Sequence, residues 1–284
     1  MKKFLLPLFV LVALHPAPAQ KEVLRASWQP GKLYKQETAM EMAAAIPGSP
    51  AEQKTTMSQT IEIRVQAEPS TGNKLANFSI TGVKADMEMM GQKMTYDSSD
   101  PAKSQPLLQQ TFGGLLNKKF TMVFDKEDKY VETRGLEDLN ANPLGQTTGM
   151  DGKQLSETIR KSFEMSLPKG PIAVGETWDI EETMDMQPIS MLVKAKGKFD
   201  SVVEIDGRKH AKLLVDGTFS TPPGAASPLT LGEGSKFSGE SLFDLERRVI
   251  TSNKSTTDLK MQMQGQSIPM KQTVTTKTTV EDAK

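Results

Sequence analysis

The chain has 284 residues, 35 basic and 35 acidic side chains, and no cysteine. Balanced charge gives no long-range field for nucleic acid or anionic lipid. The absence of cysteine excludes disulfides, Cys-His chemistry and a lipid-modified N-terminal cysteine. The length suits two small domains or one large β domain.

The first residues are typical of a secretory signal peptide. Lys2 and Lys3 precede an apolar run from Phe4 to Leu14, and small residues follow at Ala17-Pro-Ala19. The pattern predicts a signal peptide over residues 1–19, with cleavage near Ala19. No later segment reaches the roughly 20 apolar residues of a spanning helix. We therefore expect a secreted or periplasmic protein that is soluble after cleavage, with no integral membrane segment in the mature chain.

Residues 20–139 alternate apolar and polar side chains with the period of half-buried strands. The predicted strands are Tyr34–Ala44, Thr60–Glu68, Ala76–Met89 and Phe120–Phe124. The apolar parity changes after Gly82, which predicts a β-bulge there. Leu108 and Phe112 have helical spacing, but Gly113 and the glycine after it limit this segment to a short helix.

Residues 140–170 are predicted to be a linker that contains one amphipathic helix. Within Asp151–Met165, three apolar residues recur every four positions, so one side of this helix should pack on a sheet face or close an open end. Leu167–Trp178 follows, rich in proline and glycine, and ends the helical pattern.

Residues 171–284 repeat motifs of the first half in the same order. Gly207-x-Lys-x-Ala211-x-Leu213 matches Gly72-x-Lys-x-Ala76-x-Phe78, and Phe243-Asp244-x-Glu246 matches Phe124-Asp125-x-Glu127. We interpret this as an internal repeat. The predicted fold class is therefore mainly β: duplicated antiparallel meander sheets that form a sandwich, clam or barrel, with one helix between the halves and both repeats packed as one domain.

Several of these blocks resemble an uncharacterised family of secreted bacterial proteins, a domain of unknown function. The blocks are Pro30-Gly31-Lys-Leu-Tyr34, Leu116-Asn-Lys-Lys-Phe120, Gly135-Leu136-Glu137 and Val174-Gly175-Glu-Thr-Trp178. Lys129 stands where the family pattern has a glycine. The resemblance supplies no catalytic residues. The predicted architecture is also similar to that of periplasmic half-barrel carriers of lipids and lipoproteins.

Apart from the methionine pairs described below, no set of residues points to catalysis, a cofactor or a metal centre. The mature chain contains one histidine, His210, whose strand parity predicts a solvent-facing side chain. The acidic clusters Asp97-Ser-Ser-Asp100 and Asp125-Lys-Glu-Asp128 lack the spacing of a calcium loop and are typical of tight turns. Phosphate-binding and nucleic-acid-binding motifs are absent from the sequence.

Four Met-x-Met pairs form the most unusual pattern in the sequence. They are Met40 and Met42, Met87 and Met89, Met184 and Met186, and Met261 and Met263. Spacing of two places both thioethers of a pair on one sheet face. Three interpretations compete: core packing, a deformable lining for an apolar ligand, and a Cu(I) site of thioether ligands.

The sequence thus predicts a non-enzymatic extracytoplasmic binding protein that holds a lipid or other apolar small molecule between two sheets. The alternative is a structural or interaction module of the cell envelope, with a filled core and strand edges that dock an envelope protein. An apolar cavity of about 300 Å³ or more would favour the first, and a filled core the second.

Overall fold

The computed structural model describes residues 21–47, 52–89, 91–113, 116, 118–136, 156–157, 160–161, 167–186, 189–224, 229–263 and 265–283. The strands of the first half are β1 (Lys32–Ala44), β2 (Gln53–Ala67), β3 (Lys74–Met89), β4 (Gln92–Asp97), β5 (Lys119–Phe124) and β6 (Tyr130–Arg134). Those of the second half are β7 (Thr177–Met186), β8 (Ile189–Ile205), β9 (Arg208–Ser220), β10 (Leu229–Leu231), β11 (Lys236–Asp244), β12 (Val249–Met263) and β13 (Gln266–Asp282). A 3₁₀ turn at Pro101–Lys103 precedes helix α1 (Pro106–Gly113).

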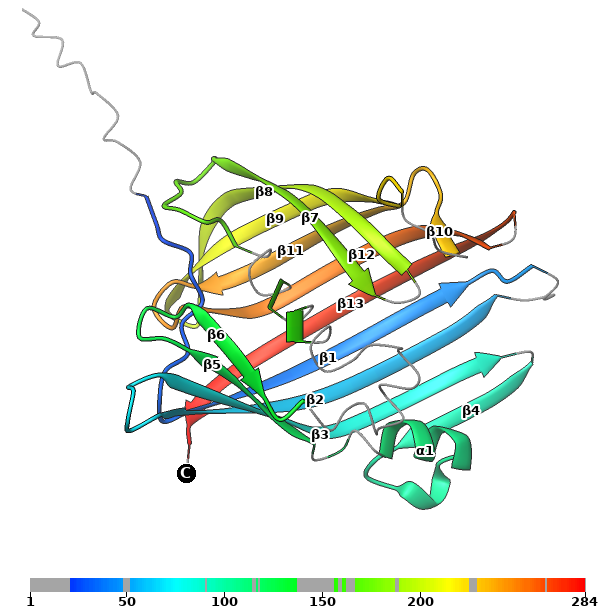
Figure 1. The fold of residues 1–284 in the computed structure, drawn as a ribbon, viewed down its shortest axis with the longest axis horizontal. Helices are drawn as coiled ribbons and strands as arrows, with labels where there is room; N and C mark the ends of the chain where they lie inside the picture. The colour runs from blue at the N-terminus through cyan, green and yellow to red at the C-terminus, as the bar shows by residue number, and fades with distance from the viewer. Residues whose placement is uncertain are drawn as a thin grey trace, which may run out of the picture.

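All thirteen strands belong to one antiparallel sheet, which confirms the predicted mainly β class. Its order is β6-β5-β3-β2-β1-β13-β12-β11-β9-β8-β7, with β4 paired to β3 and β10 paired to β12. The two meanders therefore join edge to edge through β1 and β13. The sheet curls so that β8 and β9 lie above these central strands in Figure 1, and β2 and β3 below them. Its path ends at β6 and β7, so the described strands do not close into a barrel.

Strand register puts the apolar rows of all strands on one face, which we call the inner face. On β1, Tyr34, Thr38 and Met40 lie on it, while Lys35 and Glu37 are exposed on the other side. Directly paired residues of neighbouring strands share a face, so each inner row continues into the next strand. The inner face is therefore continuous across the whole sheet.

Three clusters of buried side chains cover parts of the inner face. The first contains Trp28, Tyr34, Ile63, Phe78, Met122 and Phe124; the second Leu24, Leu167, Ile172, Phe199, Leu213 and Phe243; the third Val83, Ala85, Tyr96 and Leu108. Leu24 and Trp28 come from the segment before β1, which we call the closing segment (residues 21–29). This one segment supplies an anchor to the core of each half.

The structure agrees with several local predictions. The pairing of β2 with β3 shifts register between Thr60 and Ile61, opposite Gly82, where the bulge is predicted. Helix α1 is short, and its Leu108 packs against β3 and β4. Of the predicted helix over Asp151–Met165, only residues 156–157 and 160–161 are described, and these four are helical. The remainder of that helix and the signal peptide over residues 1–19 lie outside the described residues.

Within the described part of the chain, no helix is both long enough and apolar enough to cross a membrane.

The two halves use the same glycine position in different ways. A Cβ on Gly217 of β9 would overlap the Ala195 methyl, the Phe237 ring and the Lys194 carbonyl oxygen, at 2.5 to 2.7 Å. At the matching Gly82 of β3, the nearest atoms belong to Thr60 at 3.5 and 3.6 Å, which is ordinary contact.

We therefore expect Gly217→Ala to lower the free energy of unfolding by about 1–3 kcal/mol, because the added methyl forces backbone and ring shifts. Gly82→Ala is the matched control and should change it by less than about 0.5 kcal/mol. Urea unfolding followed by tryptophan fluorescence measures both values. Equal changes in the free energy of unfolding for the two variants would contradict the tighter packing around Gly217 than around Gly82.

Candidate ligand-binding site

The four Met-x-Met pairs lie towards the same end of the sheet. They occupy the C-terminal ends of β1, β3, β7 and β12, and antiparallel pairing makes these four strands run in the same direction. Met40, Met42, Met87, Met184 and Met261 are half-buried on the inner face, and Met263 is 42% exposed. The backbones of Met89 and Met186 continue the same strands.

The methionines differ in what they contact. Met87 packs in the third cluster with Leu108 of α1, so it fills a core. Met40 belongs to none of the three clusters, and the Gln272 side-chain amide donates a hydrogen bond to its sulfur at 2.8 Å. Met42, Met184 and Met261 also lie outside the clusters. Core packing therefore accounts for Met87, whereas the other four half-buried methionine side chains remain available as a lining.

The opposite end of the sheet contains a pocket of about 450 Å³, which we call the end pocket. Its apolar lining comes from the closing segment, β5, β6 and the stretch before β7: Leu24, Ala26, Trp28, Met122, Phe124, Tyr130, Leu167 and Pro168. Charged residues complete the lining: Arg25, Asp128, Lys129, Arg160 and Lys169. The sequence prediction of a site at the methionines missed this pocket.

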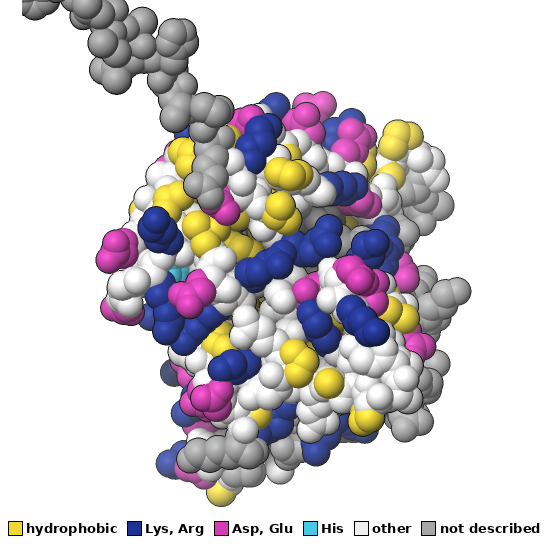
Figure 2. Space-filling model, turned by 90° about the vertical axis from the view of Figure 1, so that its left-hand side faces the viewer, with side chains coloured by type: hydrophobic (Ala, Val, Ile, Leu, Met, Phe, Trp, Pro, Cys, Tyr) yellow, Lys and Arg dark blue, Asp and Glu magenta, His cyan; other side chains and the backbone are white. Residues whose placement is uncertain are grey.

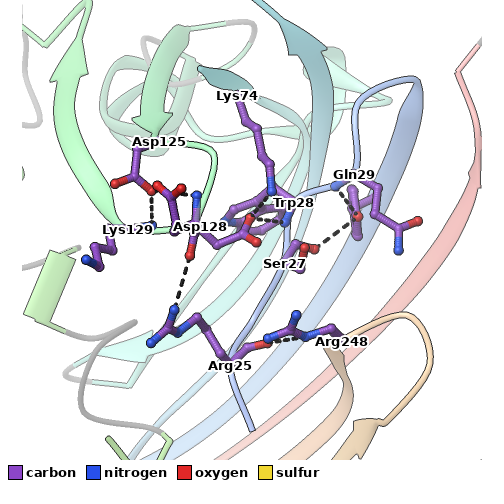
Figure 3. Close-up of polar contacts among 11 residues, drawn as sticks. Arg25, Ser27, Trp28, Gln29, Lys74, Asp125, Asp128, Lys129 and Arg248 are labelled. Atoms are coloured by element: carbon purple, nitrogen blue, oxygen red, sulfur yellow. Dashed lines mark hydrogen bonds and ion pairs between the residues drawn. The ribbon is translucent and has the colours of Figure 1, made fainter. Parts of the chain in front are cut away.

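Hydrogen bonds fix the closing segment beside the pocket (Figure 3). The Arg248 guanidinium Nε donates to the carbonyl oxygen of Arg25 at 3.2 Å, and the Ser27 backbone N–H donates to the Arg248 carbonyl at 2.9 Å. Arg25 Nη1 donates to the carbonyl oxygen of Glu127 at 3.2 Å. The segment is thus tied both to the β5–β6 turn and to the β11–β12 turn.

Asp128 is the carboxylate that joins the closing segment to β3 and to the β5–β6 turn. Its side chain is only 8% exposed, and its Oδ1 accepts from Lys74 Nζ at 2.6 Å and from the Trp28 backbone N–H at 3.1 Å. Its φ of +62° is left-handed, a conformation that aspartate tolerates better than most residues. The family pattern has a glycine at position 129, where this chain has Lys129. Here the left-handed backbone conformation is taken by Asp128, one residue earlier.

His210 is buried, so the prediction that its side chain faces solvent is wrong. The side chain is 6% exposed, with Nε2 at 3.9 Å from Oδ2 of Asp244, which is itself 1% exposed. Asp244 is the cross-strand partner of His210 on the neighbouring strand β11, and its Oδ1 accepts from the Glu246 and Arg247 backbone N–H groups, both at 2.9 Å. The alternation within β9 does not show what packs on the outer face of that strand, so it did not predict this burial.

The acidic clusters serve as turn acceptors. Asp125 Oδ1 accepts from the backbone N–H groups of Glu127 and Lys129, both at 2.9 Å. Asp97 Oδ1 accepts from the Ser99 hydroxyl at 2.6 Å and from its N–H at 2.8 Å. No group of three or more His, Cys, Asp or Glu side chains suited to a metal occurs within the described ranges.

One signal in the sequence pointed towards the end pocket. Trp28 is one of only two tryptophans, and it lies in a short segment with no strand pattern of its own. A large aromatic side chain in such a segment needs a partner surface. Asp128 and Lys74 gave no comparable signal, because their pairing joins residues 54 positions apart.

We expect Asp128→Asn to lower the free energy of unfolding by about 3 kcal/mol, because it leaves the Lys74 ammonium buried without its partner. Asparagine keeps the shape and tolerates the left-handed φ, so the loss reports the charge. The control is Asp282→Asn, at an ion pair with Lys32 of 2.7 Å in which Asp282 is 87% exposed. It should cost at most about 1 kcal/mol. Thermal unfolding of both variants measures the two losses of stability. Similar losses would contradict the conclusion that the buried Asp128–Lys74 pair stabilises the fold more than an exposed pair does.

The Ser99 hydroxyl, with help from the Lys84 ammonium at 2.9 Å, lowers the pKa of Asp97 from 3.8 to about 2. A carboxyl group whose pKa is lower in the folded than in the unfolded state stabilises the fold at pH values above its unfolded-state pKa. This stabilisation is lost as the pH falls through the folded-state pKa. We therefore expect the stability difference between wild type and Asp97→Asn to be present above pH 3.8 and to vanish near pH 2. Urea unfolding over this pH range measures it; a difference that does not change with pH would refute the assignment.

Comparison with solved structures finds a clear likeness in fold to lipovitellin. Lipovitellin, from a structure described as "Lipid-protein interactions in lipovitellin", aligns with a TM-score of 0.57 at 12% identity, over 91% of this chain and 26% of lipovitellin. The chain thus spans about a quarter of that protein's length. At this identity the likeness shows the fold alone.

Two further structures align only weakly. OccK5 (OpdH) of Pseudomonas aeruginosa has a TM-score of 0.28 at 7% identity, over 88% of this chain and 98% of that one. A putative outer membrane lipoprotein-sorting protein domain from Vibrio parahaemolyticus has a TM-score of 0.16 at 6% identity, over 87% and 84% of the two chains.

No curated protein matches the sequence. A family model does match, over residues 71–239, which is more than half of the chain and includes strands of both meanders. That family is described as a family of unknown function, in agreement with the uncharacterised family that the sequence blocks resemble. The chain therefore belongs to the family of unknown function DUF6263.

Proposed function

We propose that this protein is a non-enzymatic, extracytoplasmic binding protein that holds a lipid or other apolar ligand against the inner face of its curved sheet. The observation that carries the proposal is the end pocket. Its volume of about 450 Å³ lies within the range of small-molecule sites. It also exceeds the volume of about 300 Å³ above which a ligand-binding protein is favoured over a module with a filled core. Its floor is made of aliphatic and aromatic side chains such as Leu24, Trp28 and Phe124.

The methionine end of the inner face supports the same function. Met40, Met42, Met184 and Met261 are half-buried and lie outside the core clusters. Flexible thioethers adapt to apolar ligands of different shape. We infer that a ligand longer than the end pocket extends along the inner face towards these side chains.

The fold likeness adds support of a limited kind. Lipovitellin, whose structure is described by its lipid–protein interactions, aligns with 91% of this chain. Whether this chain binds lipid rests on its own pocket.

The direct test is native mass spectrometry of protein purified from its own envelope, followed by titration with palmitate and with 1-hexadecanol. We expect a copurified apolar molecule, or a mass shift and a raised melting temperature with at least one added probe. Ala26→Phe, which fills the end pocket, should reduce this binding at least tenfold, since the pocket is lost. The matched control is Ala39→Phe, at an exposed position on the outer face of β1.

The absence of any copurified molecule, together with no effect of either probe, would overturn the proposal. The envelope interaction module would then take its place. The sheet ends at β6 and β7, and Val131 of β6 is 51% exposed, so an extended partner segment has an edge on which to pair.

A further inference from the structure

The rim of the end pocket carries more positive than negative charge. Arg25, Lys129 and Lys169 line it and are exposed, and Asp128 is the one carboxylate in the described lining. Asp128 is already satisfied by Lys74 and the Trp28 N–H. Its charge is therefore not available to neutralise the three rim cations.

The rim cations differ from the lysines of the outer face. On the outer face, Lys194 pairs with Glu181, and Lys196 pairs with Asp179, both at 3.0 Å. None of the three rim cations (Arg25, Lys129 and Lys169) forms an ion pair with a described carboxylate. The chain as a whole has equal numbers of acidic and basic residues. The fourth lining cation, Arg160, is excluded from this group because it pairs with Glu157 at 2.7 Å.

The rim cations come from three separate segments and still face one space. Arg25 lies in the closing segment, Lys129 in the β5–β6 turn and Lys169 in the stretch before β7. The Arg25 guanidinium is held by its bond to the Glu127 carbonyl at 3.2 Å. In Figure 3 the side chains of Arg25 and Lys129 extend to the same side of the turn. Figure 2 shows Lys and Arg side chains in a band across this end of the molecule, with hydrophobic side chains close to it.

We propose that the end pocket binds a single-chain anionic amphiphile, with its hydrocarbon chain on the apolar floor and its anionic head at Arg25, Lys129 and Lys169. This inference rests on the proposed binding function and names its ligand class. An apolar floor with a cationic rim complements a molecule that is apolar along its length and negative at one end. The volume of about 450 Å³ suits one small molecule, which favours a single chain.

The test compares palmitate with 1-hexadecanol, which has the same chain length and a neutral head. Isothermal titration calorimetry should show that wild-type protein binds palmitate about 10-fold or more tightly than 1-hexadecanol. The triple variant Arg25→Gln/Lys129→Gln/Lys169→Gln should lose this preference and keep its affinity for 1-hexadecanol. The preference in wild type should also shrink on going to high salt, since the rim is exposed.

A matched triple variant controls for loss of charge alone. Lys35→Gln/Lys194→Gln/Lys196→Gln removes three cations from the outer face, where each is ion-paired, and should keep the full preference. Titration with hexadecyl phosphate tells whether the rim favours a carboxylate or a phosphate head. Either result fits an anionic head.

A second measurement locates the ligand and remains informative if the triple variant folds poorly. In a Trp178→Phe background Trp28 is the only tryptophan, and it lines the pocket. A brominated palmitate should quench its fluorescence, and unlabelled palmitate should reverse the quenching. Equal binding of palmitate and 1-hexadecanol by wild type would overturn the anionic inference and leave the binding function standing. No binding of either would overturn both, and binding without quenching would place the ligand elsewhere.

Discussion

The ladder between β1 and β13 is the constraint on which the rest of the structure depends. All 13 residues of β1 pair with β13, from Lys32 opposite Asp282 to Ala44 opposite Met270. This ladder connects two meanders that would otherwise be separate sheets with one more exposed edge each. It joins positions about as far apart in sequence as the chain allows, so we expect it to form late in folding. The continuous inner face exists only because this pairing is made.

The closing segment depends on the joined sheet in turn. Leu24 packs in the core of one half and Trp28 in the core of the other, so the segment has its two anchors only when both halves are in place. Asp128 then fixes the Trp28 backbone, and the end pocket forms between the segment and the β5–β6 hairpin. The pocket and the inner-face methionines lie at opposite ends of the same sheet, which gives the molecule one end with a lined pocket and one end with half-buried thioethers.

Local patterns in the sequence predicted what depends on neighbouring residues. Alternation predicted the strands, the change of parity at Gly82 predicted a bulge, and Gly113 limited α1 to a short helix. The missed features all join distant segments. The burial of His210 beside Asp244 and the Lys74–Asp128 pair both depend on how strands are ordered in the sheet. The sequence therefore led to the methionines, whose spacing is local, and not to the end pocket, whose lining comes from several separate segments.

The strand order restricts how many strands can be added to such a sheet. Both meanders cross the sheet in the same direction, from β1 to β6 and from β7 to β13, so they follow one another around the curve. Insertion of another six-stranded unit like that from β7 to β13 would keep every neighbouring pair antiparallel, whereas a five-stranded unit would force a parallel contact. Enlargement in even steps would therefore widen the sheet without creating a parallel contact.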